Sequence, residues 1–324
     1  RRQCFGCTCF KCEGVFWMDR LGCVPTTSDD ITMLSTIITQ AGTILENFRI
    51  RGALEQTNTE LSSTNQQLKT VNRELRIAQS RIQSDLDHAR AIQLGLLPQD
   101  IHATGSFTVA ARYVPAQAVG GDYYDVFEIA PDLYGIIVAD VSGHGISSAL
   151  IASMAKISFS NHIRTVRSPR VVIERVNAEM IRNLSTNYFL TAFVAFIDLH
   201  NNKLTYCNAG HPYPFVYRKN EQRLEPLSTP GLFIGIFENG MYEERSLYLN
   251  PGDWLLVFSD GIYGLFEGCN EKVQRHRFET ELLPRLRDTT PSDLLDGLRE
   301  RHRAMSGSET GHVNDDVSLV TIEV

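Results

Sequence analysis

The stretch GIIVADVSGHG, residues 135–145, is the most informative segment of this sequence, because an apolar run ends directly in a carboxylate. Residues 136–139 have the composition of a buried strand, and Asp140 follows them without a turn. His144 lies between two glycines in the turn-prone segment that comes next. A carboxylate at the end of a buried strand must be protonated, paired with a base or bound to a cation. We therefore take Asp140 as the first candidate functional residue.

Acids occupy the same kind of position elsewhere in the chain. Asp260 ends an apolar run in VFSDG, Asp315 and Asp316 precede another in NDDVSLV, and Asp122 follows a glycine pair in VGGDYYD. One such Asp is usually a turn or cap residue, whereas several at strand ends suggest that they converge. Lys and Arg are scarce beside these motifs, so we expect a cation to balance the acids. Oxygen ligands favour Mg, Mn or Ca, and the Cys and His spacing is not that of a zinc site.

The bulk composition limits the classes of protein to consider. The chain has 324 residues, 43% of them hydrophobic, and a net charge of −7, which predicts one or two domains and argues against nucleic-acid binding. No apolar run is long enough to span a bilayer, and no signal peptide is recognisable. Seven cysteines without a disulfide framework favour a reducing cytoplasm. Because the chain begins Arg-Arg-Gln, we expect a fragment of a longer polypeptide.

Three regions differ in residue composition and in the spacing of apolar residues, which predicts domains at 1–50, 51–95 and 96–324. A capping segment, residues 27–30, precedes a helix with an apolar stripe through residue 48. Between 51 and 95 an apolar residue recurs every seven positions: Leu54, Leu61, Leu68, Leu75, Ile82 and Ala89. The intervening seam positions are mostly Asn or Gln, which would make a parallel coiled coil marginal. A homodimer through residues 54–89 and a solvated single helix are both compatible with this pattern.

Residues 96–324 predict layered α/β structure of the α+β type. The strand-like runs are SFTVAARYV, YGIIVADV, LTAFVAFIDL, KLTYCNA, PFVYR, SLYLN, DWLLVFSD and DVSLVTIEV. The turn LHNNKL joins two of them as a hairpin. The expected helices are grouped rather than placed after every strand, at 147–165, 170–185, 276–287 and 291–305. This order favours antiparallel sheets packed under helices over a doubly wound parallel sheet.

Residues 89–324 resemble the bacterial metal-dependent serine/threonine phosphatases of the type 2C (PPM) superfamily, in the RsbU-like and SpoIIE-like branch. The resemblance rests on a series of motifs in the order of that family: ARAIQLGLLP, VGGDYYDVF, IIVADVSGHGISSALIASM, TAFVAFID, YCNAGHPYPFVY, LFIGIF, PGDWLLVFSDGI and DDVSLVTI. It implies an antiparallel β-sandwich flanked by helices, with two Mn²⁺ or Mg²⁺ ions between the sheets. By motif, Asp140 would bridge both ions, the Val141 carbonyl would bind one, and Asp260 and Asp315 would hold the other. Two such ions lower the pKa of a bridging water and neutralise phosphoryl oxygens, so no phospho-enzyme is needed.

Other positions of the motifs are less directly assigned by the resemblance. Asp122 is a candidate for both the catalytic and the metal site, where it would act in an outer layer or through metal-bound water. Asp316 is a secondary metal-ligand candidate, because it stands where relatives of the wider superfamily often have Asn. After SDGI this sequence departs from the family pattern, and the acid is displaced to Glu267. The general acid is open between His144 and His211, because either histidine could equally be structural.

The N-terminal region resembles the last strand and last helix of a GAF sensor domain, in EGVFWMDR and residues 28–50. This resemblance is weaker, and most of such a domain is missing. Four closely spaced cysteines could bind zinc or an iron–sulfur cluster or could be incidental: Cys4, Cys7, Cys9 and Cys12.

The sequence thus predicts the output part of a sensor phosphatase that acts on a phosphoserine or phosphothreonine protein. The resemblance points to an anti-sigma-factor antagonist as the substrate. A signal would reach the catalytic domain by repositioning the helix around ARAIQLGLLP. Two alternatives stay open, a pseudophosphatase scaffold that binds a phosphoprotein without turnover and a phosphatase of small molecules.

Overall fold

The computed structural model describes residues 27–98, 107–184, 188–266, 271–287, 289–306 and 315–324. The four clustered cysteines and the EGVFWMDR segment lie outside these residues. The chain divides into two compact units, Arg1–Arg81 and Ile82–Val324. No helix in the described part of the chain is long and apolar enough to cross a membrane.

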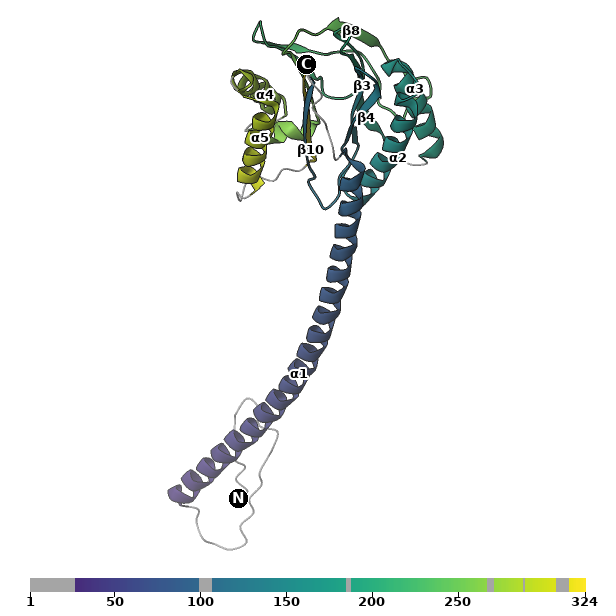
Figure 1. Ribbon diagram of the computed structural model, residues 1–324. Helices are drawn as coiled ribbons and strands as arrows, with labels where there is room; N and C mark the ends of the chain where they lie inside the picture. The colour runs from purple at the N-terminus through teal and green to yellow at the C-terminus, as the bar shows by residue number, and fades with distance from the viewer. Residues whose placement is uncertain (1–26, 99–106, 185–187, 267–270, 288, 307–314) are drawn as a thin grey trace. The chain divides into compact units, whose positions relative to one another are not determined.

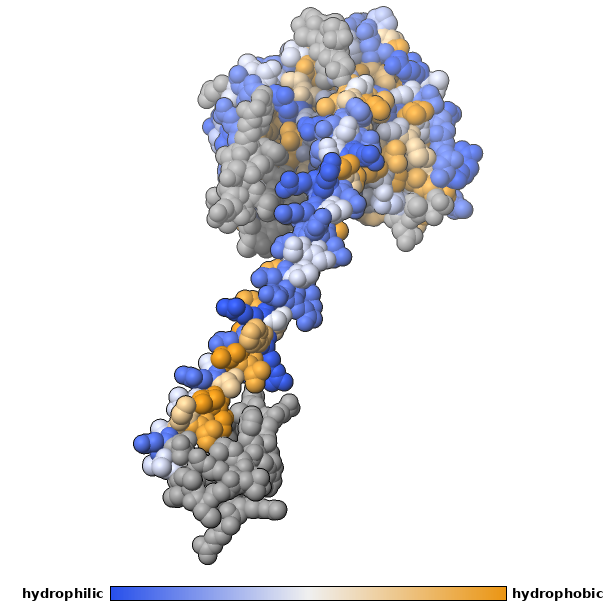
Figure 2. All heavy atoms as spheres, turned by 90° about the horizontal axis from the view of Figure 1, so that it is seen from below, coloured by the Kyte–Doolittle hydropathy of each residue, from blue (hydrophilic) through white to orange (hydrophobic). Residues whose placement is uncertain are grey.

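The first helix, α1, runs without a break over Ser28–Leu96. It joins the region we expected to be a GAF remnant to the expected linker, so the boundary at residue 50 corresponds to no change in secondary structure. The heptad residues Leu54, Leu61, Leu68 and Leu75 are all exposed. Apolar side chains appear as orange spheres among blue ones along this helix (Figure 2). The single chain therefore leaves the seam unpaired, and its pairing with a second helix stays a prediction.

The second unit contains two five-stranded antiparallel sheets, as the resemblance implied. The first sheet has the order β1-β10-β9-β6-β7, with bounds Thr108–Val114, Val317–Glu323, Trp254–Phe258, Phe215–Arg218 and Arg223–Pro226. The second has the order β2-β3-β4-β5-β8, with bounds Tyr123–Ala130, Leu133–Val141, Leu190–Asp198, Lys203–Ala209 and Glu244–Tyr248. Two of these strands, β2 and β7, were not among the predicted ones.

Helices cover the outer face of each sheet (Figure 1). The helices α2 (Ile146–Ile163) and α3 (Pro169–Asn183) pack on the sheet that contains β3 and β4. The helix α5 (Pro291–Ser306) packs on β1 and β10, next to α4 (Glu271–Leu286) and the short 3-10 helix η1 (Asp260–Leu265). All four predicted helices are confirmed to within a few residues, except that α4 begins five residues before its predicted start.

One large apolar core lies along both faces of the second sheet, and a smaller one lies under α4 and α5. The central strands β3 and β4 are buried on both faces, which explains their nearly continuous apolar composition. The predicted hairpin joins β4 to β5, and Asn202 takes the left-handed conformation there, with φ of 50°. These rigid strands support the chain segments that carry the acids.

Candidate metal and phosphoryl-transfer site

The predicted acids come from strand ends of both sheets. Asp140 is the next-to-last residue of β3, and Asp122 directly precedes β2, whose first residue pairs with Ala139. The two strands are joined beyond the ladder by a hydrogen bond from Val141 N to Gly121 O at 3.3 Å. Antiparallel pairing therefore places the Asp122 and Asp140 backbones opposite each other.

The other sheet contributes Asp260 and Asp315. Asp260 begins η1, two residues after β9, and Asp315 precedes β10 by two residues. Because β9 pairs with β10, both acids arise at one end of this sheet. Both are exposed, unlike Asp122, which is buried.

The electrostatics show that these carboxylates lie near one another. Burial raises the pKa of Asp122 well above its usual value, and the negative charge of Asp140 raises it further. Burial also raises the pKa of Asp140, and Asp260, Asp315 and Asp316 add to this effect. The site thus gathers acids whose charged forms are disfavoured by burial and by one another.

Asp316 holds the glycine-pair segment through its carboxylate. One oxygen accepts a hydrogen bond from Ala116 N at 2.8 Å, and the other accepts from Gly121 N at 2.5 Å and Asp122 N at 3.4 Å. The segment approaches so closely that a Cβ on Gly120 would lie 2.1 Å from the Asp316 carboxylate. Asp316 is therefore a positioning residue for Asp122, and its role as a metal ligand stays a prediction.

A second glycine is required on the other side of the same acid. A Cβ on Gly261 would lie 2.0 Å from the Asp316 carbonyl oxygen, which is backbone and cannot move aside. The Ser259 hydroxyl donates to this carbonyl at 3.2 Å and accepts from Ser318 N at 2.9 Å. The glycine in SDG thus lets η1 pack against the segment that carries Asp315 and Asp316.

The two candidate general acids differ sharply in environment. His144 is exposed, and its Nδ1 lies 2.8 Å from the Gln117 side-chain nitrogen. His211 is buried, its Nδ1 lies 2.8 Å from the Thr191 hydroxyl, and burial lowers its pKa to about 3. His211 is therefore neutral at physiological pH, and the hydrogen bond to Thr191 holds its buried ring in place. Of the two histidines, only His144 is placed to exchange protons with a substrate.

Two residues of the site were not predicted as functional. Gln93 of α1 is buried, and its side-chain amide donates to Gly120 O at 2.5 Å and accepts from Gly120 N at 3.1 Å. The Tyr113 hydroxyl of β1 is buried beside Gly120 without a hydrogen-bond partner, and burial and Asp316 raise its pKa. Gln93 lies in the ARAIQLGLLP motif, which was the available signal, whereas nothing in the sequence marked Tyr113.

The candidate ligand atoms are carboxylate and carbonyl oxygens, which are the atom type that a hard divalent cation prefers. Asp122 Oδ2 is buried with no hydrogen-bond partner, and the other acids offer only oxygen. The Val141 carbonyl faces the glycine pair, since a Cβ on Gly121 would lie 2.8 Å from it. In the described part of the chain, however, no three His, Cys, Asp or Glu side chains are arranged so as to share one ion.

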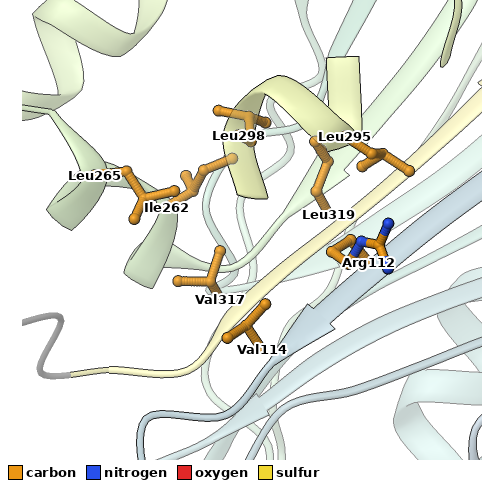
Figure 3. A pocket seen from close by; sticks show the side chains of 8 residues that line it. All are labelled: Arg112, Val114, Ile262, Leu265, Leu295, Leu298, Val317 and Leu319. Carbon is orange, nitrogen blue, oxygen red and sulfur yellow. The ribbon is translucent and has the colours of Figure 1, made fainter. Parts of the chain in front are cut away.

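A small apolar pocket lies under α5 (Figure 3). Its walls come from β1, η1, α5 and β10, and they include Ile262, Leu295 and Leu319. At about 10 Å³ it has room for about one water molecule. This pocket belongs to the packing under α5 and is no ligand site.

Comparison with solved structures identifies the fold. The SiaA-PP2C domain of Pseudomonas aeruginosa is 23% identical with a TM-score of 0.60, covering 76% of this chain and 98% of that one. The RsbU and RsbW domains of Rv1364c from Mycobacterium tuberculosis are 26% identical with a TM-score of 0.57, covering 67% and 59%. The second unit therefore has a PP2C-type fold.

Comparison of sequences then gives the family. Residues 130–324 match the family described as Stage II sporulation protein E (SpoIIE), and the chain belongs to it. Phosphoserine phosphatase RsbU of Bacillus subtilis (strain 168) is 31% identical over 184 residues, which is 57% of this chain and 55% of that protein. The chain spans about half the length of the curated relatives it matches.

Proposed function

We propose that this chain is a metal-dependent phosphoserine/phosphothreonine protein phosphatase, the output part of a partner-switching signalling protein. The observation that carries the proposal is the opposed pair Asp122 and Asp140. Burial and the charge of Asp140 raise the pKa of Asp122, and burial and the charges of Asp260, Asp315 and Asp316 raise the pKa of Asp140. Family membership and the name of the relative RsbU, a phosphoserine phosphatase, support it. Following the resemblance, we propose a phosphorylated anti-sigma-factor antagonist as the substrate.

We propose two Mn²⁺ or Mg²⁺ ions, held by Asp140, the Val141 carbonyl, Asp260 and Asp315. When bound, such ions would activate water and offset the charge of the phosphoryl oxygens. Asp140 would face both ions from the rigid end of β3. Asp122 would orient water from its buried position, and Asp316 would keep Asp122 in place through the loop amides.

His144 would donate the proton that the leaving serine or threonine oxygen needs. It is exposed, and Asp315 lies close enough for the two side chains to interact electrostatically. A Gln at this position would keep a hydrogen-bonding side chain but could not transfer a proton. We expect His144→Gln to lower kcat by about a hundredfold on alkyl phosphate esters, with less effect on aryl esters, whose leaving groups need less protonation.

The domain proposals concern the regions before the PP2C-type domain. We propose that residues 1–50 are the end of a GAF-like sensor domain, that 51–95 form a dimeric signalling linker, and that 96–324 are the catalytic domain, in the cytoplasm. The double hydrogen bond between Gln93 and Gly120 supports signalling through this helix, because it joins the end of α1 to the segment that leads into Asp122.

The test is hydrolysis of p-nitrophenyl phosphate with added Mn²⁺. Asp140→Asn should lower kcat at least a thousandfold, since it weakens the proposed bridging ligand. The matched control is Asp132→Asn in the turn at the other end of the same strand, where Asn also tolerates the observed φ of 63°. A wild-type chain that folds and binds Mn²⁺ but hydrolyses neither this ester nor a phosphoprotein would leave the pseudophosphatase as the better description. Turnover of the ester alone would favour a small-molecule phosphatase.

A further inference from the structure

The loop between β7 and β8 displays an unusual set of apolar side chains. Residues 228–237, STPGLFIGIF, contain no charge. Ile234 is fully buried, but its neighbours are exposed to solvent by roughly two fifths to four fifths: Leu232 40%, Phe233 39%, Ile236 46%, Phe237 48% and Met241 81%. Contiguous exposed apolar side chains commonly mark an interaction site. We refer to residues 232–241 as the apolar loop.

The backbone of the apolar loop is fixed to the rest of the domain. Ile234 and Leu190 exchange two hydrogen bonds, at 2.9 and 3.0 Å. The buried Asn177 of α3 donates to Phe237 O and accepts from Gly235 N, both at 2.8 Å. The exposed side chains are therefore held in position before any partner arrives, which lowers the entropic cost of binding.

The apolar loop lies beside the candidate catalytic site. Leu190 pairs with Val141 across β3 and β4, so Ile234 is two strand spacings from Val141, about 10 Å. Phe189 exchanges hydrogen bonds with Ser142, at 2.9 and 3.1 Å, and stacks on Phe233 with 4.8 Å between ring centroids. Hydrogen bonds and the Phe189–Phe233 stack thus link the apolar loop to the end of β3 that carries Asp140.

We propose that the apolar loop docks apolar side chains that flank the phosphorylated residue of a protein substrate. An extended chain covers about 10 Å in three residues, so a phosphoserine at Asp140 would place its near neighbours over this loop. The acids recognise a phosphoryl group only through cations and cannot select the surrounding chain, whereas exposed apolar side chains on a fixed backbone can. The partner is therefore a phosphoprotein with Leu, Ile or Val within about three residues of its phosphoserine. This inference rests on the proposed phosphatase function.

The experiment compares two phosphoserine peptides of equal length and charge, one flanked by Leu and Ile and the other by Ser and Asn. The variant is Ile236→Ser with Phe237→Ser, because both side chains are exposed. The control is Tyr248→Ser, which removes an exposed aromatic ring near the end of the same sheet that lies away from the acids. Wild type and control should prefer the apolar peptide about tenfold in kcat/KM, and the double variant should lose this preference. No preference in wild type, or an unchanged preference in the double variant, would overturn the proposal.

Binding separates this inference from the proposed function. Fluorescence anisotropy of the labelled apolar peptide, with its phosphoserine replaced by the non-hydrolysable phosphonate analogue and measured on the wild-type chain with Mn²⁺, needs no turnover. We expect binding that weakens about tenfold when Ile236→Ser and Phe237→Ser are added, even if wild type proves catalytically inactive. Equal binding with and without these changes would refute docking while leaving the phosphatase intact. A drop in molecular mass on the double substitution would instead assign the apolar loop to contact between copies of this chain.

Discussion

The apolar side chains of helix residues 28–81 are mostly exposed, whereas those of the domain 82–324 are mostly buried. In the domain, Ile136, Ile137 and Val138 are fully buried between other elements of the same chain. In the helix, Leu54, Leu61 and similar residues stay exposed, because one helix has no second surface to cover them. A self-sufficient core can fix acids in place, whereas an exposed apolar seam is buried only if a second surface covers it.

The largest expected effect is on the free energy of unfolding, when one Phe→Ala substitution is made in each of the two regions. Phe193 is fully buried on β4, so Phe193→Ala should lower the free energy of unfolding by about 3–5 kcal/mol. Phe48 is exposed on α1, so Phe48→Ala should change it by less than about 0.5 kcal/mol. Urea unfolding followed by circular dichroism measures both. Similar losses in the two variants would contradict the division into a packed domain and an uncovered helix.

The next effect concerns the last turns of α1, which belong to the domain. Gln93→Ala leaves both backbone groups of Gly120 without their side-chain partner, which should cost about 1–3 kcal/mol and lower turnover by displacing Asp122. Gln83→Ala is the matched control on the same helix, because its bond to Asp87 is exposed. Thermal unfolding and p-nitrophenyl phosphate turnover should both fall for the first variant and stay near wild type for the second. A wild-type rate for Gln93→Ala would show that the hydrogen bonds between α1 and Gly120 do not affect turnover.

A smaller effect is expected on the pH dependence of the domain's stability when a chelator removes cations. The folded pKa of Asp140 is raised, so the folded state holds its proton more tightly than the unfolded state does. Its contribution to stability is therefore lost as pH rises from about 4 through the raised pKa. Asp140→Asn should raise the unfolding temperature at pH 7 in chelator and flatten its pH dependence. Mn²⁺ should stabilise wild type more than the variant, and the reverse order would argue against Asp140 as a ligand.

The smallest effect on the stability of the domain is expected from substitutions in the heptad seam of the helix. Leu61→Ser with Leu75→Ser should weaken a dimer without changing the unfolding of the domain, because both side chains are exposed in the single chain. Ile77→Ser, which is exposed but off the seam, is the control. Light scattering over a range of concentrations reports the mass. An identical mass for wild type and double variant would favour the solvated single helix.

Much of the architecture was predictable because local patterns and tertiary contacts agree. The four helices and the β4–β5 hairpin follow from periodicity and turn residues. The strand β2 was missed because its sequence places Asp125 among apolar residues. The Tyr123 hydroxyl at 2.8 Å and the Lys156 ammonium at 3.0 Å stabilise that buried carboxylate, and the second of these partners is 31 residues away. A sequence pattern cannot show a partner that only the fold supplies.

The sequence by itself determined which residue types carry the chemistry. Acids at strand ends and glycines beside them are local features, and the resemblance of their motifs to the family predicts Asp140, Asp260 and Asp315 as metal ligands. The tertiary structure alone decided which groups are accessible and what holds them. Burial makes His211 structural and leaves His144 available, and long-range hydrogen bonds make Asp316 the support of Asp122. The physical reason is that solvation and pKa depend on neighbours brought together across nearly two hundred residues of chain.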